Sequence, residues 1–297
     1  MLLLLLCGVL AIGGIFLLRL TVFKQSSLKL AEGKTVLCLP GGSSGIGKAT
    51  AMNLARRGAK VILACQERLR AEAAVQEIIQ KTGNQQVTFM HLDLASLQSV
   101  RSFAENFLKS ESRLDLLINN AGEFIHLFFY IYGKTEDGFG MIFGVNYLGH
   151  FLLTLLLLDR LKASGPSRVV NVASKAYESG KVDFNCLMTH KDLGLGNNSF
   201  QLLMMYCHSK LCTVLFTYEL AKRLQGSNVT CYSLHPASDT EAGAQTSLHC
   251  ALEPGIEHLS GHYFTKCSPV TNIHPKGRDD ATSRKLWELS ESFCGLS

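Results

Sequence analysis

The sequence predicts a doubly wound α/β fold, in which helices cover both faces of a parallel β-sheet. Short apolar runs rich in Val, Ile and Leu alternate along the chain with longer segments of helical periodicity. This alternation is typical of repeated right-handed βαβ crossovers. A glycine-rich turn follows the first apolar run, where such a fold passes from strand into helix. An apolar segment at the N-terminus precedes the predicted domain.

The length favours one large domain, expected over residues 34–297. The 297 residues are 47% hydrophobic and 18% charged, and no internal repeat or low-complexity tract is evident. The net charge of +5 is modest, and the basic residues are scattered rather than clustered with aromatic residues. This distribution disfavours nucleic-acid binding. Oligomeric state is left open.

Residues 1–20 predict a membrane anchor or a signal segment. Met1 to Leu18 contains no charged side chain, and basic residues follow from Arg19 onward. A helix needs roughly 17 to 25 apolar residues to span the hydrocarbon, so residues 1–18 could reach across a membrane. The charge bias then predicts a cytoplasmic domain at the endoplasmic reticulum or a related membrane. Signal cleavage into the secretory pathway is the alternative, slightly favoured by sequons at Asn197 and Asn228.

The strands and helices are expected in alternating order. The strand-like runs are residues 35–39, 60–65, 87–92, 114–119, 168–173 and 229–235. Helical spacing covers residues 69–79 and 97–108, while the apolar run 151–158 is too short to span a membrane and predicts the buried face of a long helix.

Ten cysteines do not by themselves imply disulfides. Cys38, Cys65, Cys212 and Cys231 lie in apolar runs, and no C-x-x-C spacing typical of a metal site occurs. We expect reduced, mostly buried thiols and no metal.

The glycine turn after residues 35–39 has the composition of a phosphate cradle. Glycines let backbone N–H groups approach a pyrophosphate, and the helix that follows offers its positive end. A dinucleotide is therefore expected on Gly41, Ser43, Ser44, Gly45, Ile46 and Gly47.

A Tyr-x-x-x-Lys spacing places a phenol and an ammonium on one helical face, but it occurs three times. The pairs that begin at Tyr130 and Tyr177 each enclose a glycine and have no helical apolar period around them. Around Tyr206 and Lys210, apolar residues recur at spacings of three and four. They are Leu203, Leu211, Val214, Leu215, Tyr218, Ala221 and Leu224. The third pair is therefore the candidate.

In this order, the motifs resemble the short-chain dehydrogenase/reductase family over nearly the whole domain. Residues 135–139 and 146–151 look like its retinol-dehydrogenase branch. The resemblance implies a Rossmann fold and a catalytic tetrad of Asn146, Ser174, Tyr206 and Lys210. It also implies nucleotide contacts at Asp93, Leu94, Asn120, Ala121, Gly122, Tyr206 and Lys210.

The resemblance assigns a role to each member of the tetrad. Tyr206 would exchange a proton with the substrate oxygen, which Ser174 would hold by a hydrogen bond. Lys210 would favour the phenolate and contact the nicotinamide ribose. Asn146 would support a proton-relay water. The expected reaction is hydride transfer between nicotinamide and an apolar, retinoid-like alcohol or carbonyl.

Three departures from the family pattern bear on activity. Pro40 replaces a threonine before the glycine turn, which removes a backbone donor. Cys65 and Gln66 provide no acid at the end of the second strand, which favours NADP over NAD, with Gln66 facing the adenine ribose and Arg68 as a compensating cation.

The third departure lies between residues 235–237 and 244–246, where relatives carry a substrate-covering lid of a few tens of residues. A nucleotide-binding pseudoenzyme, or a splice-altered chain without turnover, is therefore the alternative function.

Overall fold

A computed structural model of the chain describes residues 31–39, 45–121, 133–195, 198–236 and 240–296. They form an eight-stranded sheet in the order β3-β2-β1-β4-β5-β6-β7-β8, with all neighbours parallel except β7 and β8. The strands are β1 (Thr35–Leu39), β2 (Lys60–Cys65), β3 (Val87–His91), β4 (Leu116–Asn119), β5 (Ser167–Val172), β6 (Val229–His235), β7 (Tyr263–Thr265) and β8 (Ser268–Pro269). The predicted doubly wound Rossmann fold is confirmed.

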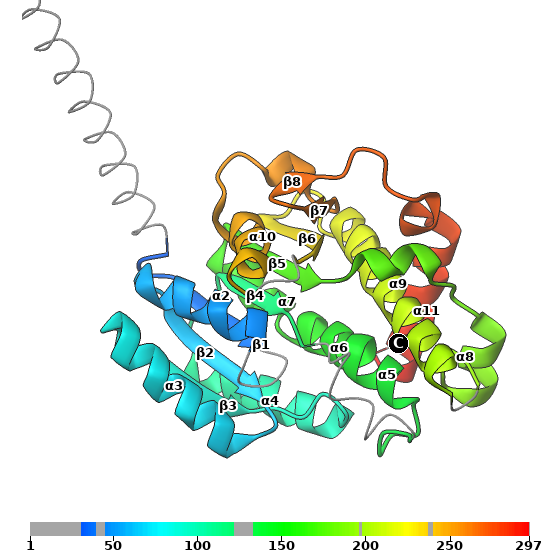
Figure 1. The fold of residues 1–297 in the computed structure, drawn as a ribbon, viewed down its shortest axis with the longest axis horizontal. Helices are drawn as coiled ribbons and strands as arrows, with labels where there is room; N and C mark the ends of the chain where they lie inside the picture. The colour runs from blue at the N-terminus through cyan, green and yellow to red at the C-terminus, as the bar shows by residue number, and fades with distance from the viewer. Residues whose placement is uncertain (1–30, 40–44, 122–132, 196–197, 237–239, 297) are drawn as a thin grey trace, which may run out of the picture.

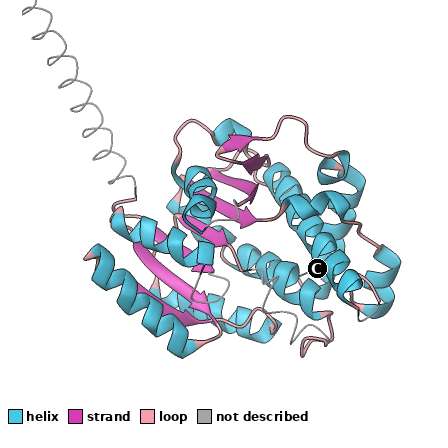
Figure 2. Cartoon of the chain, in the orientation of Figure 1, coloured by secondary structure: helices cyan, strands magenta, loops and turns pink. Residues whose placement is uncertain are grey.

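Helices cover both faces of this sheet (Figures 1 and 2). The α-helices are α2 (Gly45–Arg56), α3 (Arg68–Thr82), α4 (Leu97–Ser110), α5 (Met141–Phe143), α6 (Gly149–Leu156), α7 (Leu158–Ser164), α8 (Phe184–His190), α9 (Ser199–Arg223), α10 (Thr240–Leu252) and α11 (Asp280–Phe293). The shorter turns are a π-helix, η2 (Gly144–Leu148), and the 3-10 helices η3 (Lys175–Ser179), η4 (Glu257–Leu259) and η5 (Pro275–Arg278).

Alternation along β1 shows how the strands build two cores. Leu37 and Leu39 join the apolar cluster formed with α4, α6, α9 and α11, whereas Val36 and Cys38 join the cluster formed with α2, α3 and α10. Successive side chains of a strand point to opposite faces, so an unbroken apolar run is what a doubly covered sheet requires.

The predicted long helix over residues 151–158 is interrupted. Phe151 and Leu157 are fully buried as expected, but α6 ends at Leu156 and α7 begins at Leu158, with a bend of 52° between the segments 141–156 and 158–164. At the break, the Leu157 N–H is shared between the carbonyls of Leu153 and Leu155. Among the described residues, no single helix could cross a membrane; only this bent pair has the required length and composition.

The cysteines expected to be buried are buried. Cys38, Cys65, Cys212 and Cys231 are 0% to 9% exposed, and burial raises the pKa of the Cys38 thiol to about 12. Cysteines in the described part of the chain are unpaired. Burial in an apolar surrounding keeps such thiols protonated and unreactive.

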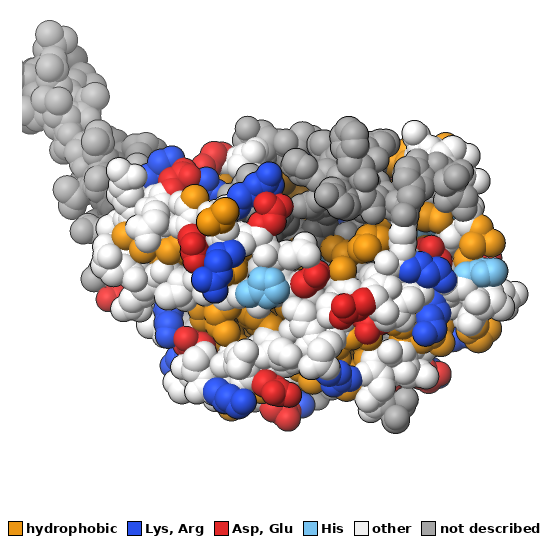
Figure 3. Space-filling model, turned by 90° about the horizontal axis from the view of Figure 1, so that it is seen from below, with side chains coloured by type: hydrophobic (Ala, Val, Ile, Leu, Met, Phe, Trp, Pro, Cys, Tyr) orange, Lys and Arg blue, Asp and Glu red, His pale blue; other side chains and the backbone are white. Residues whose placement is uncertain are grey.

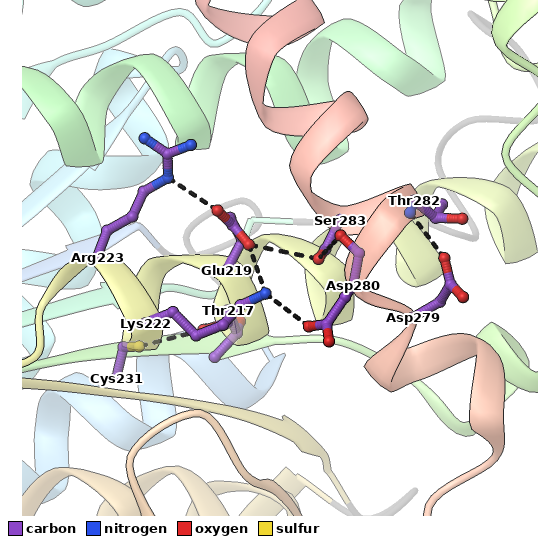
Figure 4. A network of polar contacts seen from close by, with 9 residues as sticks. All are labelled: Thr217, Glu219, Lys222, Arg223, Cys231, Asp279, Asp280, Thr282 and Ser283. Carbon is purple, nitrogen blue, oxygen red and sulfur yellow. Dashed lines mark hydrogen bonds and ion pairs between the residues drawn. The ribbon is translucent and has the colours of Figure 1, made fainter.

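A buried carboxylate fastens the C-terminal helix α11 to α9 (Figure 4). Glu219 is 7% exposed, and its oxygens lie 2.7 Å from Lys222 Nζ and 3.0 Å from Arg223 Nε. Ser283 of α11 donates to the same carboxylate at 3.4 Å, and Lys222 also reaches Asp280 at 2.8 Å. These contacts hold α11 along the C-terminal half of α9.

Candidate active site

The parallel register brings the candidate residues to one edge of the sheet. Leu39 lies opposite Asn119 and Asn119 opposite Asn171, while Val172 lies opposite Leu234. The strand order reverses between β1 and β4, and ligands of such sheets bind outside the carboxyl ends of the strands at this switch point.

Tyr206, Lys210 and Ser174 meet at this edge. Tyr206 and Lys210 occupy successive turns of α9, and Lys210 Nζ lies 5.5 Å from the centroid of the Tyr206 ring. Ser174 follows β5 and hydrogen-bonds to the Tyr206 phenol; its Oγ also accepts from Ala176 N at 3.2 Å and so caps η3. Lys210, one turn along α9, and Ser174, at the end of β5, therefore both lie beside the Tyr206 side chain.

A capping box fixes where α9 begins, and therefore where Tyr206 stands. The Asn198 side chain accepts from Gln201 N at 2.9 Å, and the Gln201 side chain accepts from Asn198 N at 3.2 Å. Such reciprocal bonds satisfy donors that a helix N-terminus leaves unpaired. Tyr206 follows about two turns later.

Burial dominates the electrostatics of the tyrosine and lysine. It raises the pKa of Tyr206, while the hydrogen bond with Ser174 lowers it, and the raised direction prevails. Lys210 is 2% exposed, and burial lowers its pKa to about 8; its Nζ donates to Val172 O at 3.0 Å. Burial is thus the largest effect on both groups, and it acts against the charged form of each.

Asn146 lies in the π-helix η2, a geometry that is frequent at functional sites. Its side chain is 1% exposed, and its Nδ2 donates to Ser209 Oγ at 3.2 Å. Ser209 Oγ in turn donates to Tyr206 O at 2.8 Å, which ties the asparagine to the catalytic turn of α9. Asn146 Oδ1 has no hydrogen-bond partner among the residues that the structure describes, so a buried acceptor remains for a water or ligand.

His150 is a site residue that the sequence motifs do not reveal. It is 6% exposed, and its Nδ1 lies 3.2 Å from Asn146 O, while its Nε2 has no hydrogen-bond partner in the described part of the chain. Burial lowers the pKa of His150 to about 4, so the ring is neutral near pH 7. The only sequence signal is its position four residues after Asn146, which places both on one helical face.

A second unforeseen set of polar residues lies beneath the site. Asn119 Nδ2 donates to Asn171 Oδ1 at 2.8 Å, and Asn171 Nδ2 donates to Thr217 Oγ1 at 2.9 Å. Asn119 also reaches Thr154 at 3.1 Å. These buried bonds connect β4, β5, α6 and α9, so they hold the strand ends and the tyrosine helix in a single arrangement.

The described part of the predicted nucleotide site lies at the start of α2 and after the end of β4. Gly45 opens α2 with φ of +67°, and a Cβ built there would meet no atom of the described residues within 4 Å. Ile46 and Gly47 form the first turn of α2, and Asn120 and Ala121 follow β4. Pro40, Gly41, Ser43, Ser44 and Gly122 lie outside the described residues.

At the neighbouring strand ends, Gln66 and Asp93 face each other. Gln66 Nε2 donates to Asp93 Oδ2 at 2.8 Å, while Asp93 Oδ1 accepts from Ala95 N at 2.8 Å. Leu94 is buried beside them. Arg68 Nη1 lies 3.5 Å from Glu72 and its side chain is 71% exposed.

The other Tyr-x-x-x-Lys pairs are not comparable. Tyr177 is buried in η3, where its hydroxyl accepts from His274 N at 3.1 Å, and Lys181 pairs with Asp183 at 3.5 Å. Tyr130 lies outside the described residues. Of the two described candidates, Tyr206 is the one beside a lysine ammonium and the strand-end serine.

The fold, together with Ser174, Tyr206 and Lys210 at the carboxyl edge of the sheet, is typical of a nucleotide-dependent oxidoreductase. Comparison with known proteins shows to which family of oxidoreductases the chain belongs. The family model described as short chain dehydrogenase matches residues 35–186. Human "Retinol dehydrogenase 12" is 46% identical over 285 residues, which cover 88% of this chain and 86% of that protein. The chain belongs to the short-chain dehydrogenase family, in its retinol-dehydrogenase-like branch, and is a short-chain NAD(P)-dependent alcohol dehydrogenase by class.

Two further relatives support this placement. "Dehydrogenase/reductase SDR family member 13" of Bos taurus is 46% identical over 292 residues, covering 89% of this chain and 74% of that protein. Residues 243–248 and 286–288 resemble that relative in particular. The crystal structure of an uncharacterized protein from Mycobacterium Paratuberculosis has a TM-score of 0.74 at 33% identity, covering 89% of this chain and 94% of that one.

Proposed function

We propose that this chain transfers a hydride between NADP and the alcohol or carbonyl of an apolar, retinoid-like molecule. The observation that carries the proposal is the contact between the Tyr206 phenol and the Ser174 hydroxyl, with Lys210 one turn along α9. A bound nicotinamide dinucleotide supplies or accepts the hydride, and the side chains of the protein handle the proton.

In this proposal Tyr206 exchanges a proton with the substrate oxygen, and Ser174 donates a hydrogen bond to the same oxygen. Lys210 contacts the nicotinamide ribose, and its buried ammonium favours negative charge on the phenol. Asn146 Oδ1, the unpartnered acceptor, holds a relay water. Each of these roles uses an atom already positioned by the bonds described above.

The NADP preference rests on the end of β2. Gln66, an amide rather than an acid, stands where NAD-binding relatives use an acid to accept the ribose 2′-hydroxyl. NAD is the alternative cofactor.

The apolar substrate is proposed from the relatives named retinol dehydrogenases and from the surroundings of Tyr206. Ile142, Leu202 and Met205 form a small apolar cluster at the start of α9, next to the catalytic turn. Such side chains contribute hydrophobic contact area but few polar contacts, which suits a hydrocarbon chain with one oxygen.

The proposal is tested by following NADPH oxidation by the full chain with retinaldehyde and with aliphatic aldehydes. Retinaldehyde is expected to accelerate the oxidation, and the reaction is expected to disappear in Tyr206→Phe. No acceleration by any aldehyde, in a protein that binds NADP, would instead support the second candidate.

That second candidate is a nucleotide-binding pseudoenzyme or splice-altered chain without turnover. It is favoured by one observation: β6 ends at His235 and α10 begins at Thr240. A connection of this length has no room for a lid of a few tens of residues, and such lids exclude water and complete the substrate pocket.

We also propose that residues 1–18 anchor the protein in the endoplasmic reticulum or a related membrane, with the domain in the cytosol. The support is the uncharged segment followed by basic residues. In sealed microsomes, external protease should digest the domain. A mature chain cleaved near Leu20, or glycans on Asn197 or Asn228, would place the domain in the secretory lumen.

A further inference from the structure

Exposed apolar side chains are concentrated in one stretch of the sequence that ends three residues before Tyr206. Among the described residues, six large hydrophobic side chains are exposed, and four of them lie within residues 188–203: Met188, Leu195, Phe200 and Leu203. They are 53%, 62%, 70% and 40% exposed. Single exposed apolar residues are ordinary, but a group of them marks an interaction surface. We call these four side chains the apolar patch.

The apolar patch is not the inner stripe of an amphipathic helix. On the first turns of α9, the inward positions are already taken by Leu202 and Met205, which are 5% and 7% exposed. Phe200 and Leu203 project from the same turns yet remain open to solvent. Leu203 belonged to the predicted apolar stripe, so its exposure departs from that prediction. The start of α9 therefore carries apolar residues on its outer side as well.

Basic groups flank the apolar patch at both ends of α8. Lys134 Nζ donates to His190 O at 2.8 Å, and Lys191 Nζ lies 4.9 Å from the centroid of the Phe139 ring. At the other end, Lys285 Nζ lies 4.5 Å from the centroid of the Phe184 ring. In Figure 3, the end of the molecule that carries α8 shows hydrophobic side chains next to Lys or Arg and a histidine.

The acidic groups of the same region do not cancel this charge. Asp192 is partly buried, and burial raises its pKa. Asp183 caps α8 by accepting from Cys186 N at 3.1 Å and pairs with Lys181 at 3.5 Å. Among the described residues, no carboxylate forms an ion pair with Lys134, Lys191 or Lys285.

We propose that the apolar patch docks on an anionic phospholipid bilayer. Exposed apolar side chains that enter the headgroup region, with lysines beside them facing anionic lipid, are the combination that interfacial binding requires. A soluble protein partner would not need the basic flanks. A second copy of this chain would bring the same basic groups together and repel.

The location of the apolar patch gives the docking a function. Leu203 precedes Tyr206 by three residues on α9, so both lie on adjacent turns of one face. A bilayer against Leu203 would lie next to the catalytic tyrosine, and an apolar substrate could pass from lipid to the site without crossing water. This last step rests on the proposed function; the docking itself does not.

The test uses tryptophan fluorescence in the full chain with vesicles of phosphatidylcholine and phosphatidylserine that carry brominated acyl chains. Phe200→Trp places a reporter in the apolar patch. Leu69→Trp is the matched control, because Leu69 is an equally apolar residue, 82% exposed, on α3. The only native tryptophan, Trp287, is 4% exposed and contributes the same background to both.

Bromolipid is expected to quench the added Phe200→Trp emission by at least about half and the Leu69→Trp emission hardly at all. Omitting phosphatidylserine should weaken the quenching. Equal quenching at both positions, or none at either, would overturn the proposal. So would a concentration-dependent blue shift of Phe200→Trp without lipid, which would identify a second copy as the partner. Because no turnover is measured, failure here leaves the assay of the proposed function unaffected.

Discussion

Lys210 Nζ lies 5.5 Å from the centroid of the Tyr206 ring and donates a 3.0 Å hydrogen bond to the carbonyl of Val172. The backbone of β5 thus holds the ammonium beside the phenol, at a depth where both groups are largely removed from water. Burial raises the pKa of Tyr206 and lowers the pKa of Lys210. Because both groups are largely removed from water, a charged ligand that binds beside them should shift the pKa of each strongly.

Tyr206→Phe should lower turnover by at least about 100-fold, because positioned acid–base groups contribute on the order of 10²–10⁴. NADP binding measured by calorimetry should be retained. Tyr177→Phe is the control, since that phenol contacts His274 N rather than Ser174. An equal loss of chemistry in folded Tyr177→Phe would overturn the assignment.

Lys210→Met should abolish turnover without destabilising the protein. Burial lowers the pKa of Lys210 to about 8, below its ordinary value of 10.5, so the folded state carries a penalty for the ammonium that is fully present below pH 8. The penalty fades as pH rises from 8 toward 10.5, because the unfolded chain then binds more protons. At pH 7, the Tm of the Lys210→Met variant should exceed the wild-type Tm by about 2–4 °C or more. The difference in Tm between the two proteins should be smaller at pH 9.5. A Lys210→Met variant that is less stable than wild type at pH 7 would contradict this account.

Gln66→Arg should strengthen NADP binding at least several-fold and leave NAD binding nearly unchanged. A guanidinium pairs well with a 2′-phosphate, whereas Gln66 now donates to Asp93. Calorimetry at one ionic strength measures both nucleotides. Tighter binding of NAD than NADP by the wild-type chain would refute the NADP preference.

Glu219→Gln should lower the free energy of unfolding by on the order of 1 kcal/mol, because the carboxylate loses its charge while Lys222 and Arg223, which are 32% and 39% exposed, stay partly hydrated. Burial pushes the pKa of Glu219 up, but the bonds and charges of Lys222 and Arg223 prevail and lower it. Wild-type stability from this group is therefore present above about pH 4.5 and is lost as pH falls below it. Denaturant unfolding of Glu219→Gln against Glu288→Gln, an exposed position on α11, measures the difference. Equal effects would show that the network in Figure 4 contributes little.

Grafting the complete lid of a relative between Pro236 and Ala244 should lower the apparent KM for an apolar aldehyde and raise kcat, since the lid closes the pocket over the substrate. NADP binding should change less, because most of the residues proposed to hold the nucleotide follow β1, β2, β3 and β4 rather than β6. Full activity of the present chain, with no gain after a correctly folded graft, would show that another segment closes the pocket. The apolar residues 124–132, outside the described part, are then the first to examine.

The secondary structure of this protein and the positions of its motifs could largely be predicted from the sequence. Six strands follow from short unbroken apolar runs, and the helices α3, α4 and α9 follow from the 3.6-residue period; the bounds of β1, β2 and β6 agree with the predicted ones. The family motifs lie at strand ends because a parallel sheet collects those ends at one edge. The short strands β7 and β8, of three and two residues, have no period to detect.

Only the tertiary structure decided what surrounds the candidate residues. The spacing of Tyr206 and Lys210 is local, but the bond between Asn119 and Asn171 depends on strand pairing, and the burial of His150 depends on which helical face packs inward. The exposure of Phe200 was equally unreadable, because periodicity predicts which residues share a face and not what covers it. Sequence specifies short-range geometry through backbone periods; long-range packing decides burial, and burial sets the pKa of Lys210.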